Sequence, residues 1–247
     1  MYPYRNTNLL GYLQKKRHYL ILLAVLVLLT PLLWRSSLNN VTIPGKESYY
    51  YLVESQTEGQ NTLLVHPFLW LLSFNDSIWY HLLLPVALGL MSIWCLTQLR
   101  RTLGLDEQEQ LVFLIFFILS PAFISSFTTL NPTALMLTLL LTGFYLITRK
   151  EPLVRWGALF PFSLLVLFDM FSSLVLLLVL IPYTVIKKDK AGNILTGAVI
   201  VLALIAVVVL QKPFFASPFF MEDRLTEFFS DLGGMRGMNL FILVLAV

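Results

Sequence analysis

Apolar runs, each close to the length of a membrane-crossing helix, follow one another along most of this chain. Crossing a hydrocarbon core of about 30 Å takes roughly 20 apolar helical residues, because the backbone must satisfy its hydrogen bonds within the segment. Charged residues make up 13% of the 247 residues and apolar residues 57%, whereas soluble domains carry about a quarter charged residues. The sequence therefore predicts an all-α polytopic membrane protein, with residues 1–247 as a single transmembrane domain.

Run length and bounding polar residues place the expected crossings. Five of them are His18–Trp34, Ile78–Leu99, Gln110–Phe127, Pro132–Thr148 and Ile194–Gln211. No small-residue cleavage site follows the first run, so we interpret it as a retained helix rather than a signal peptide. The last run begins at Asn239 and would rise only about 13 Å, which predicts an eighth helix that is cut short.

The apolar stretch Trp156–Ile186 needs a separate interpretation. As one helix its 31 residues would rise about 47 Å, which is too long for a single crossing even when tilted. Asp169 interrupts the stretch near its middle. We therefore expect a hairpin of two short helices that turns around Phe168–Ser172, for a total of seven complete crossings.

Lysines and arginines test the orientation, because loops rich in them stay in the cytoplasm. With a cytoplasmic N-terminus, 12 of the 17 basic residues lie inside, and the five outside are Arg35, Lys46, Lys212, Arg224 and Arg236. This orientation leaves two long outer segments, Arg35–Ser77 and Lys212–Met238. The piece Leu63–Phe74 in the first is too short to cross, which predicts an interfacial or re-entrant helix.

The first outer segment carries the best candidate for a catalytic base. Glu47 follows the turn-forming pair Pro44-Gly45 and precedes three tyrosines, which would anchor the loop at the headgroup level with their hydroxyls in water. A partly desolvated carboxylate can have its pKa raised and accept a proton from a hydroxyl. The alternative is a solvated loop residue that pairs with Lys46 or Arg35.

This arrangement resembles the GT-C superfamily of membrane glycosyltransferases, and within it most closely the archaeal relatives of the oligosaccharyltransferase catalytic subunit. The similar features are Glu47-Ser48-Tyr49-Tyr50, then His66-Pro67, then Ser120-Pro121-Ala122-Phe123-Ile124 followed by Asn131-Pro132. The resemblance implies a GT-C-like helical core, a long first outer loop and a catalytic acid at Glu47.

One departure from that family concerns metal binding. Oligosaccharyltransferase subunits carry a second acidic motif between the third and fourth helices, where this chain has Thr128–Pro132 without an acid. Mg²⁺ or Mn²⁺ would need oxygen ligands, which Asn131 and Asp169 would supply. Alternatively, Asn131 is the N-cap of a helix that starts at Pro132, and Asp169 is a charge that ends the hairpin at the interface.

Basic residues near the headgroup plane suit a lipid-linked phosphate. We expect Lys46 and Arg35 to contact it, with His66, Tyr49 and Tyr50 completing the donor site, and Arg224 and Arg236 are competitors for the phosphate. The expected function is transfer of a sugar from a polyprenyl-phosphate donor to an acceptor outside the cell membrane, without nucleic acid. The alternatives are a non-catalytic assembly subunit that kept the fold and, third, a transporter.

Overall fold

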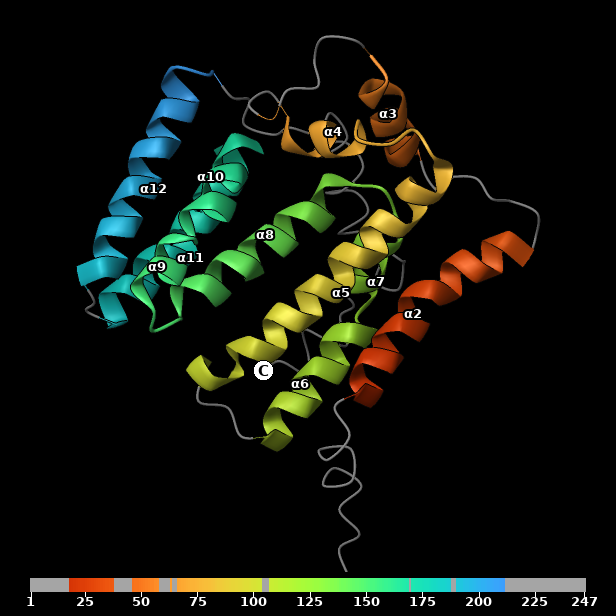
Figure 1. Ribbon diagram of the computed structural model, residues 1–247, viewed down its shortest axis with the longest axis horizontal. Helices are drawn as coiled ribbons and strands as arrows, with labels where there is room; N and C mark the ends of the chain where they lie inside the picture. The colour runs from red at the N-terminus through yellow and green to blue at the C-terminus, as the bar shows by residue number, and fades with distance from the viewer. Residues whose placement is uncertain are drawn as a thin grey trace, which may run out of the picture.

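The computed structural model describes residues 18–37, 46–57, 63, 66–103, 107–168, 170–187 and 190–211. These residues form helices joined by short turns (Figure 1). The helices are α2 (His18–Ser37), α3 (Lys46–Ser55), α4 (Pro67–Leu72), α5 (Ile78–Leu103), α6 (Glu107–Leu119), α7 (Pro121–Thr128), α8 (Pro132–Ile147), α9 (Pro152–Trp156), α10 (Leu159–Phe168), α11 (Met170–Lys187) and α12 (Lys190–Val208). The expected all-helical class is confirmed for this part of the chain.

In the part of the chain that the structure describes, three helices are long and apolar enough to cross a membrane, namely α5, α11 and α12. The pair α6 and α7 makes a fourth if the two are counted as one bent span. Shorter apolar helices lie at Tyr19–Trp34, Pro132–Ile147 and Pro152–Phe168. Hydropathy and length therefore indicate a membrane protein.

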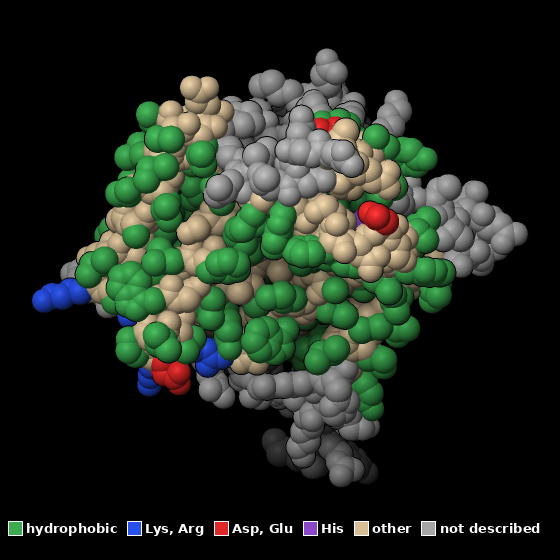
Figure 2. All heavy atoms as spheres, turned by 45° about the horizontal axis from the view of Figure 1, so that its top comes forward, with side chains coloured by type: hydrophobic (Ala, Val, Ile, Leu, Met, Phe, Trp, Pro, Cys, Tyr) green, Lys and Arg blue, Asp and Glu red, His purple; other side chains and the backbone are tan. Residues whose placement is uncertain are grey.

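The outward-facing side chains of these helices are as apolar as the inward-facing ones. On α2, α11 and α12, Leu26, Leu178 and Leu204 are exposed by 55%, 74% and 60%. Figure 2 shows hydrophobic side chains covering most of the described part of the visible face, with charged ones near its upper and lower ends. Such surfaces suit a helix bundle in lipid, because lipid tails solvate apolar side chains.

The expected continuous helix Gln110–Phe127 is wrong, because the chain breaks at Ser120. Helices α6 and α7 meet there at an angle of 58°. Pro121 has no N–H to donate to the preceding turn, and its ring clashes with the carbonyl four residues back. The Ser120 hydroxyl instead accepts from the backbone N–H of Phe123 at 3.1 Å and caps α7.

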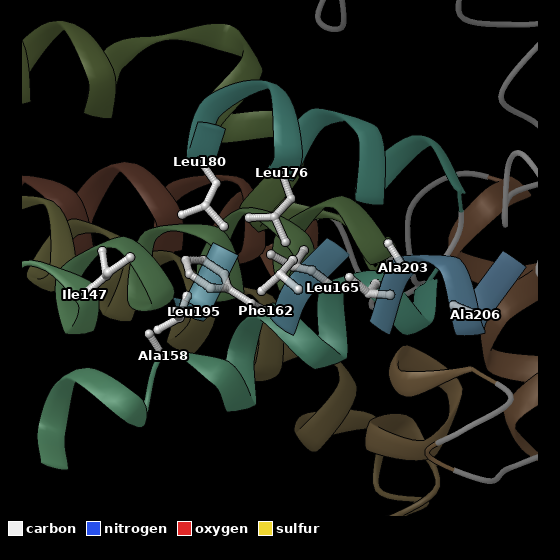
Figure 3. Packing of buried hydrophobic residues seen from close by; sticks show 11 residues of the cluster. Ile147, Ala158, Phe162, Leu165, Leu176, Leu180, Leu195, Ala203 and Ala206 are labelled. Carbon is white, nitrogen blue, oxygen red and sulfur yellow. The ribbon is translucent and has the colours of Figure 1, made fainter. Parts of the chain in front are cut away.

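The stretch Trp156–Ile186 is divided into α10 and α11, as the hairpin interpretation expected. The Ser173 hydroxyl lies 3.5 Å from the carbonyl oxygen of Val166, seven residues earlier, where a straight helix would rise about 10.5 Å. Figure 3 shows Leu176 and Leu180 of α11 near Phe162 of α10, with α12 packed alongside. The chain therefore folds back on itself next to Asp169, which is outside the described residues.

Helices α5 and α8 lie side by side in the middle of the bundle and share a buried polar contact. The Ser92 hydroxyl is 2.9 Å from the Thr138 hydroxyl. Helix α7 packs on the other flank of α5, where a Cβ on Gly89 would lie 3.0 Å from Phe127. Close packing of this kind, rather than hydrophobicity, holds helices together in lipid.

Short helices cap one end of this bundle. Helices α3 and α4 lie together at the top of Figure 1, near the start of α5 and of α8. Two bonds tie the end of α4 to the start of α5: the Tyr80 hydroxyl donates to the Leu71 carbonyl at 2.8 Å, and His81 Nε2 lies 3.3 Å from the Leu72 carbonyl. His81 is buried in this arrangement.

Several helix starts agree with the expectations, whereas the helix ends differ from them by one to four residues. Helices α2, α5 and α8 begin at the expected residues, and α12 begins at Lys190, four residues before the expected start. The expected interfacial helix within Leu63–Phe74 is the six-residue α4. The second outer segment Lys212–Met238 and the final run from Asn239 lie outside the described residues.

Candidate functional site

The segment that carries Glu47 is a helix rather than the expected loop. Helix α3 begins at Lys46, directly after Pro44-Gly45, and contains no glycine or proline. Its two faces differ: Ser48, Tyr51 and Ser55 are buried, whereas Tyr49 and Tyr50 are exposed by 59% and 38%. The buried positions recur at the three- and four-residue spacing of one helix face. The expectation of three wet tyrosines is therefore wrong for Tyr51, which is 1% exposed.

A buried hydrogen bond joins α3 to the loop before α8. The backbone N–H of Leu130 donates to the Ser48 hydroxyl oxygen at 3.1 Å. Ser48 follows Glu47 directly, and Leu130 precedes Asn131 directly. The structure therefore brings together the two segments that the GT-C resemblance singled out, although they are far apart in the sequence.

Aromatic packing brings a third segment to the same place. The ring of Tyr51 lies 5.4 Å from Phe68 of α4 and 6.1 Å from His66. His66 in turn lies 5.7 Å from Phe168 at the end of α10. These contacts belong to a hydrophobic cluster formed by α3, α4, α8 and α10, which also contains Leu130 and Leu135. Phe168 is the last described residue before Asp169.

His66 has a structural role in this arrangement. Its Nδ1 accepts a hydrogen bond from the backbone N–H of Leu69 at 3.3 Å and so caps the start of α4. Because Nδ1 is an acceptor, the proton of the neutral ring sits on Nε2. The cap therefore fixes the orientation of the His66 ring.

Asn131 is the N-cap of α8, as one of the two sequence interpretations expected. Its side-chain oxygen accepts from the Ala134 backbone N–H at 3.1 Å, and its side-chain nitrogen donates to the Thr129 hydroxyl at 2.7 Å. Extended backbone dihedrals and Pro132 at the first helical position complete a typical helix start. Asn131 is 8% exposed.

For three further candidates, Lys46, Glu47 and Arg35, the structure describes the position of the backbone. Lys46 and Glu47 form the first turn of α3, and Arg35 lies in the last turn of α2. On the exposed face of α3, partial burial and the nearby Glu54 carboxylate raise the pKa of the Tyr50 hydroxyl. Tyr50 therefore stays protonated at neutral pH and can donate a hydrogen bond.

A metal ion has few ligands among the residues the structure describes. No three side chains of His, Cys, Asp or Glu gather there in a group that would hold an ion. Asn131 offers one neutral oxygen, which already accepts a hydrogen bond. Asp169, the other ligand that the sequence suggested, lies outside the described residues.

Two residues at this end were not among the sequence candidates for the site. Ser48 and Tyr51 connect α3 to α8 and α4, yet the sequence presented them as part of a polar, tyrosine-rich loop. Their spacing of three residues was the available signal. It would have identified them if the segment had been recognised as a helix.

Comparison with protein families, with characterised proteins and with solved structures finds no match for this chain.

Proposed function

We propose that this chain is a membrane glycosyltransferase that moves a sugar from a polyprenyl-phosphate donor to an acceptor at the outer face of the membrane. The observation that carries the proposal is the bond between Ser48 and Leu130. It holds the first turn of α3, with Lys46 and Glu47, beside the start of α8. Helix α4 and the end of α10 complete this end of the bundle through His66 and Phe168.

In the proposed reaction Glu47 takes the proton of the acceptor hydroxyl as that oxygen attacks the anomeric carbon. The bond from the sugar to the phosphate breaks, and the phosphate leaves with the electron pair on its lipid carrier. Lys46 and Arg35 neutralise the leaving phosphate, and the His66 Nε2–H donates to one of its oxygens. Tyr49 and Tyr50 line the approach of the sugar. No metal step is used, and a cation held by Asp169 would add charge at the phosphate.

The proposed topology has seven crossings within the described residues. The seven are α2, α5, the bent pair α6 and α7, α8, the unit α9 and α10, α11, and α12, with a GT-C-like arrangement and the N-terminus in the cytoplasm. Charge supports this orientation: among the described side chains, those of α3 and of the turn after α4 that carry charge are acidic, Glu54 and Asp76. The described basic side chains lie at the opposite end, on or next to α8, α9, α11 and α12, namely Arg149, Lys150, Arg155, Lys187 and Lys190.

A charge-neutralising variant tests the proposal directly. Membranes that contain the Glu47→Gln protein should transfer no label from a radiolabelled polyprenyl-phosphate sugar, at unchanged expression and membrane insertion. Glu54→Gln is the matched control, because Glu54 is a second acid on α3, two turns away, and should keep full activity. Full activity in Glu47→Gln would remove Glu47 from the mechanism.

A non-catalytic assembly subunit is the second candidate function. It is favoured by the capping role of Asn131 in a loop that has no acid. If the unaltered protein transfers no label from any polyprenyl-phosphate sugar and instead co-purifies with other membrane proteins, the assembly role replaces the transferase.

A further inference from the structure

The end of the bundle opposite α3 and α4 carries a basic cluster. The described side chains with positive charge are Arg149, Lys150, Arg155, Lys187 and Lys190, and they lie at the ends of α8, α9, α11 and α12 that face this side. Figure 2 shows the blue side chains together at the lower edge of the visible face. The charge is concentrated where the helices leave the apolar layer.

Contacts between the helices hold these residues in one region. The Arg149 guanidinium lies 4.3 Å from the centre of the Tyr145 ring and donates to the Tyr145 hydroxyl. The neighbouring Phe144 ring lies 6.0 Å from Tyr183 of α11, and α9 packs against α8. The ends of α8, α9 and α11 therefore form one surface.

Strongly exposed apolar side chains lie among the charges of this surface. Leu153 of α9 is 86% exposed, and Val185 and Ile186 near the end of α11 are 65% and 78% exposed. Trp156 is 41% exposed. In water, such exposure of apolar side chains would contribute no favourable free energy. At the boundary between headgroups and acyl chains, apolar residues are solvated by lipid while lysine and arginine reach the headgroups.

We propose that this end, comprising the α8–α9 turn, α9, the end of α11 and the start of α12, binds anionic phospholipids. Their phosphodiester groups contact Arg149, Lys150, Lys187 and Lys190, and Leu153 with Ile186 enters the acyl boundary. Charge complementarity selects the ligand, since a positively charged surface at the cytoplasmic side faces an anionic leaflet. The proposal concerns the end away from Glu47 and holds whether or not that end performs transfer.

The composition of the lipids that the protein retains tests this proposal directly. The full chain is reconstituted in nanodiscs of phosphatidylcholine with a minority of phosphatidylglycerol, stripped with mild detergent, and the retained lipids are quantified. Phosphatidylglycerol should be enriched several-fold over the input mixture. Lys187→Gln and Lys190→Gln should each lower the enrichment toward the ratio of the input mixture, because each removes one positive charge near the membrane surface. High salt should weaken it.

Two acidic variants separate a local surface from overall charge. Glu151→Gln removes an exposed negative charge at the basic end and should raise the enrichment, a gain that misfolding cannot produce. Glu54→Gln makes the same charge change at the opposite end and should leave it unchanged. Equal retention of both lipids, unchanged retention in the lysine variants, or an equal gain from Glu54→Gln would each overturn the proposal.

Discussion

The hydroxyl oxygen of Ser48 accepts a hydrogen bond from the backbone N–H of Leu130, 82 residues later in the chain, at 3.1 Å. Ser48 is 1% exposed and Leu130 2%. Both hydrogen-bonding groups are buried, so water cannot replace either partner. The bond therefore fixes how α3 packs on the start of α8. The position of Glu47 relative to Asn131 follows from it.

Replacing the hydroxyl should therefore be costly. Ser48→Ala leaves the buried N–H of Leu130 without its acceptor, which costs about 1–3 kcal/mol of unfolding free energy. Thermal unfolding of the purified protein in detergent measures the loss. Ser73→Ala is the control, because the exposed Ser73 hydroxyl donates to the Trp70 carbonyl, three residues earlier, at the end of α4. Equal losses in the two variants would contradict a special role for the bond.

Helix positions were readable from the sequence where an apolar run had clear polar or proline boundaries. The starts of α5 and α8 at Ile78 and Pro132 agree for this reason. The break at Ser120 was missed because the run through it stays apolar, and only Pro121 marks it. The early start of α12 at Lys190 was missed because charged and small residues there continue a helix that hydropathy alone cannot detect.

The sequence was sufficient to predict which segments form the site, but not which contacts join them. Resemblance singled out Glu47 and Asn131, and local rules predicted the cap at Asn131. The bond from Ser48 to Leu130 depends on the tertiary packing of α3, which no local pattern encodes. The metal and donor roles of Asp169, Lys46 and Arg35 stay predictions.

Close packing of α8 on α10 gives a second prediction. A Cβ on Gly143 would lie 2.1 Å from the Phe162 ring, which is fully buried. Gly143→Ala should therefore cost about 1–3 kcal/mol through overpacking. Gly197→Ala is the matched control: its Cβ meets nothing within 4 Å, and helix propensity should make it neutral or stabilising by up to about 1 kcal/mol.

A double substitution tests the cause of that loss. Phe162→Leu shortens the facing side chain, so the pair Gly143→Ala and Phe162→Leu should cost less than the sum of the single variants. Unfolding free energies of the four proteins give the coupling. If the double variant loses as much unfolding free energy as the two single variants together, the added methyl group destabilises the protein through contacts other than Phe162.

The hydroxyl contact between α5 and α8 should contribute little in spite of its burial. Thr138 donates to the Ala134 carbonyl at 2.7 Å, which leaves the Ser92 hydroxyl to donate to Thr138. Interhelical bonds of this kind average about 0.6 kcal/mol in membrane proteins, because the unfolded helices find other partners. A double-mutant cycle of Ser92→Ala and Thr138→Val should give a coupling near that value. A coupling above about 2 kcal/mol would contradict this account.

Two substitutions of Asn131 distinguish its role as a helix cap from a role as a metal ligand. Asn131→Ala removes the acceptor for the Ala134 N–H and should cost about 0.5–2 kcal/mol. Asn131→Asp keeps the acceptor and places a negative charge at the helix N-terminus but loses the donor to Thr129, so it should cost less unfolding free energy than Asn131→Ala. Thermal unfolding with and without Mg²⁺ distinguishes the roles: a cap gives the same differences in both conditions. If Mg²⁺ stabilises the unaltered protein and that gain disappears in Asn131→Ala, the amide oxygen is a metal ligand as well.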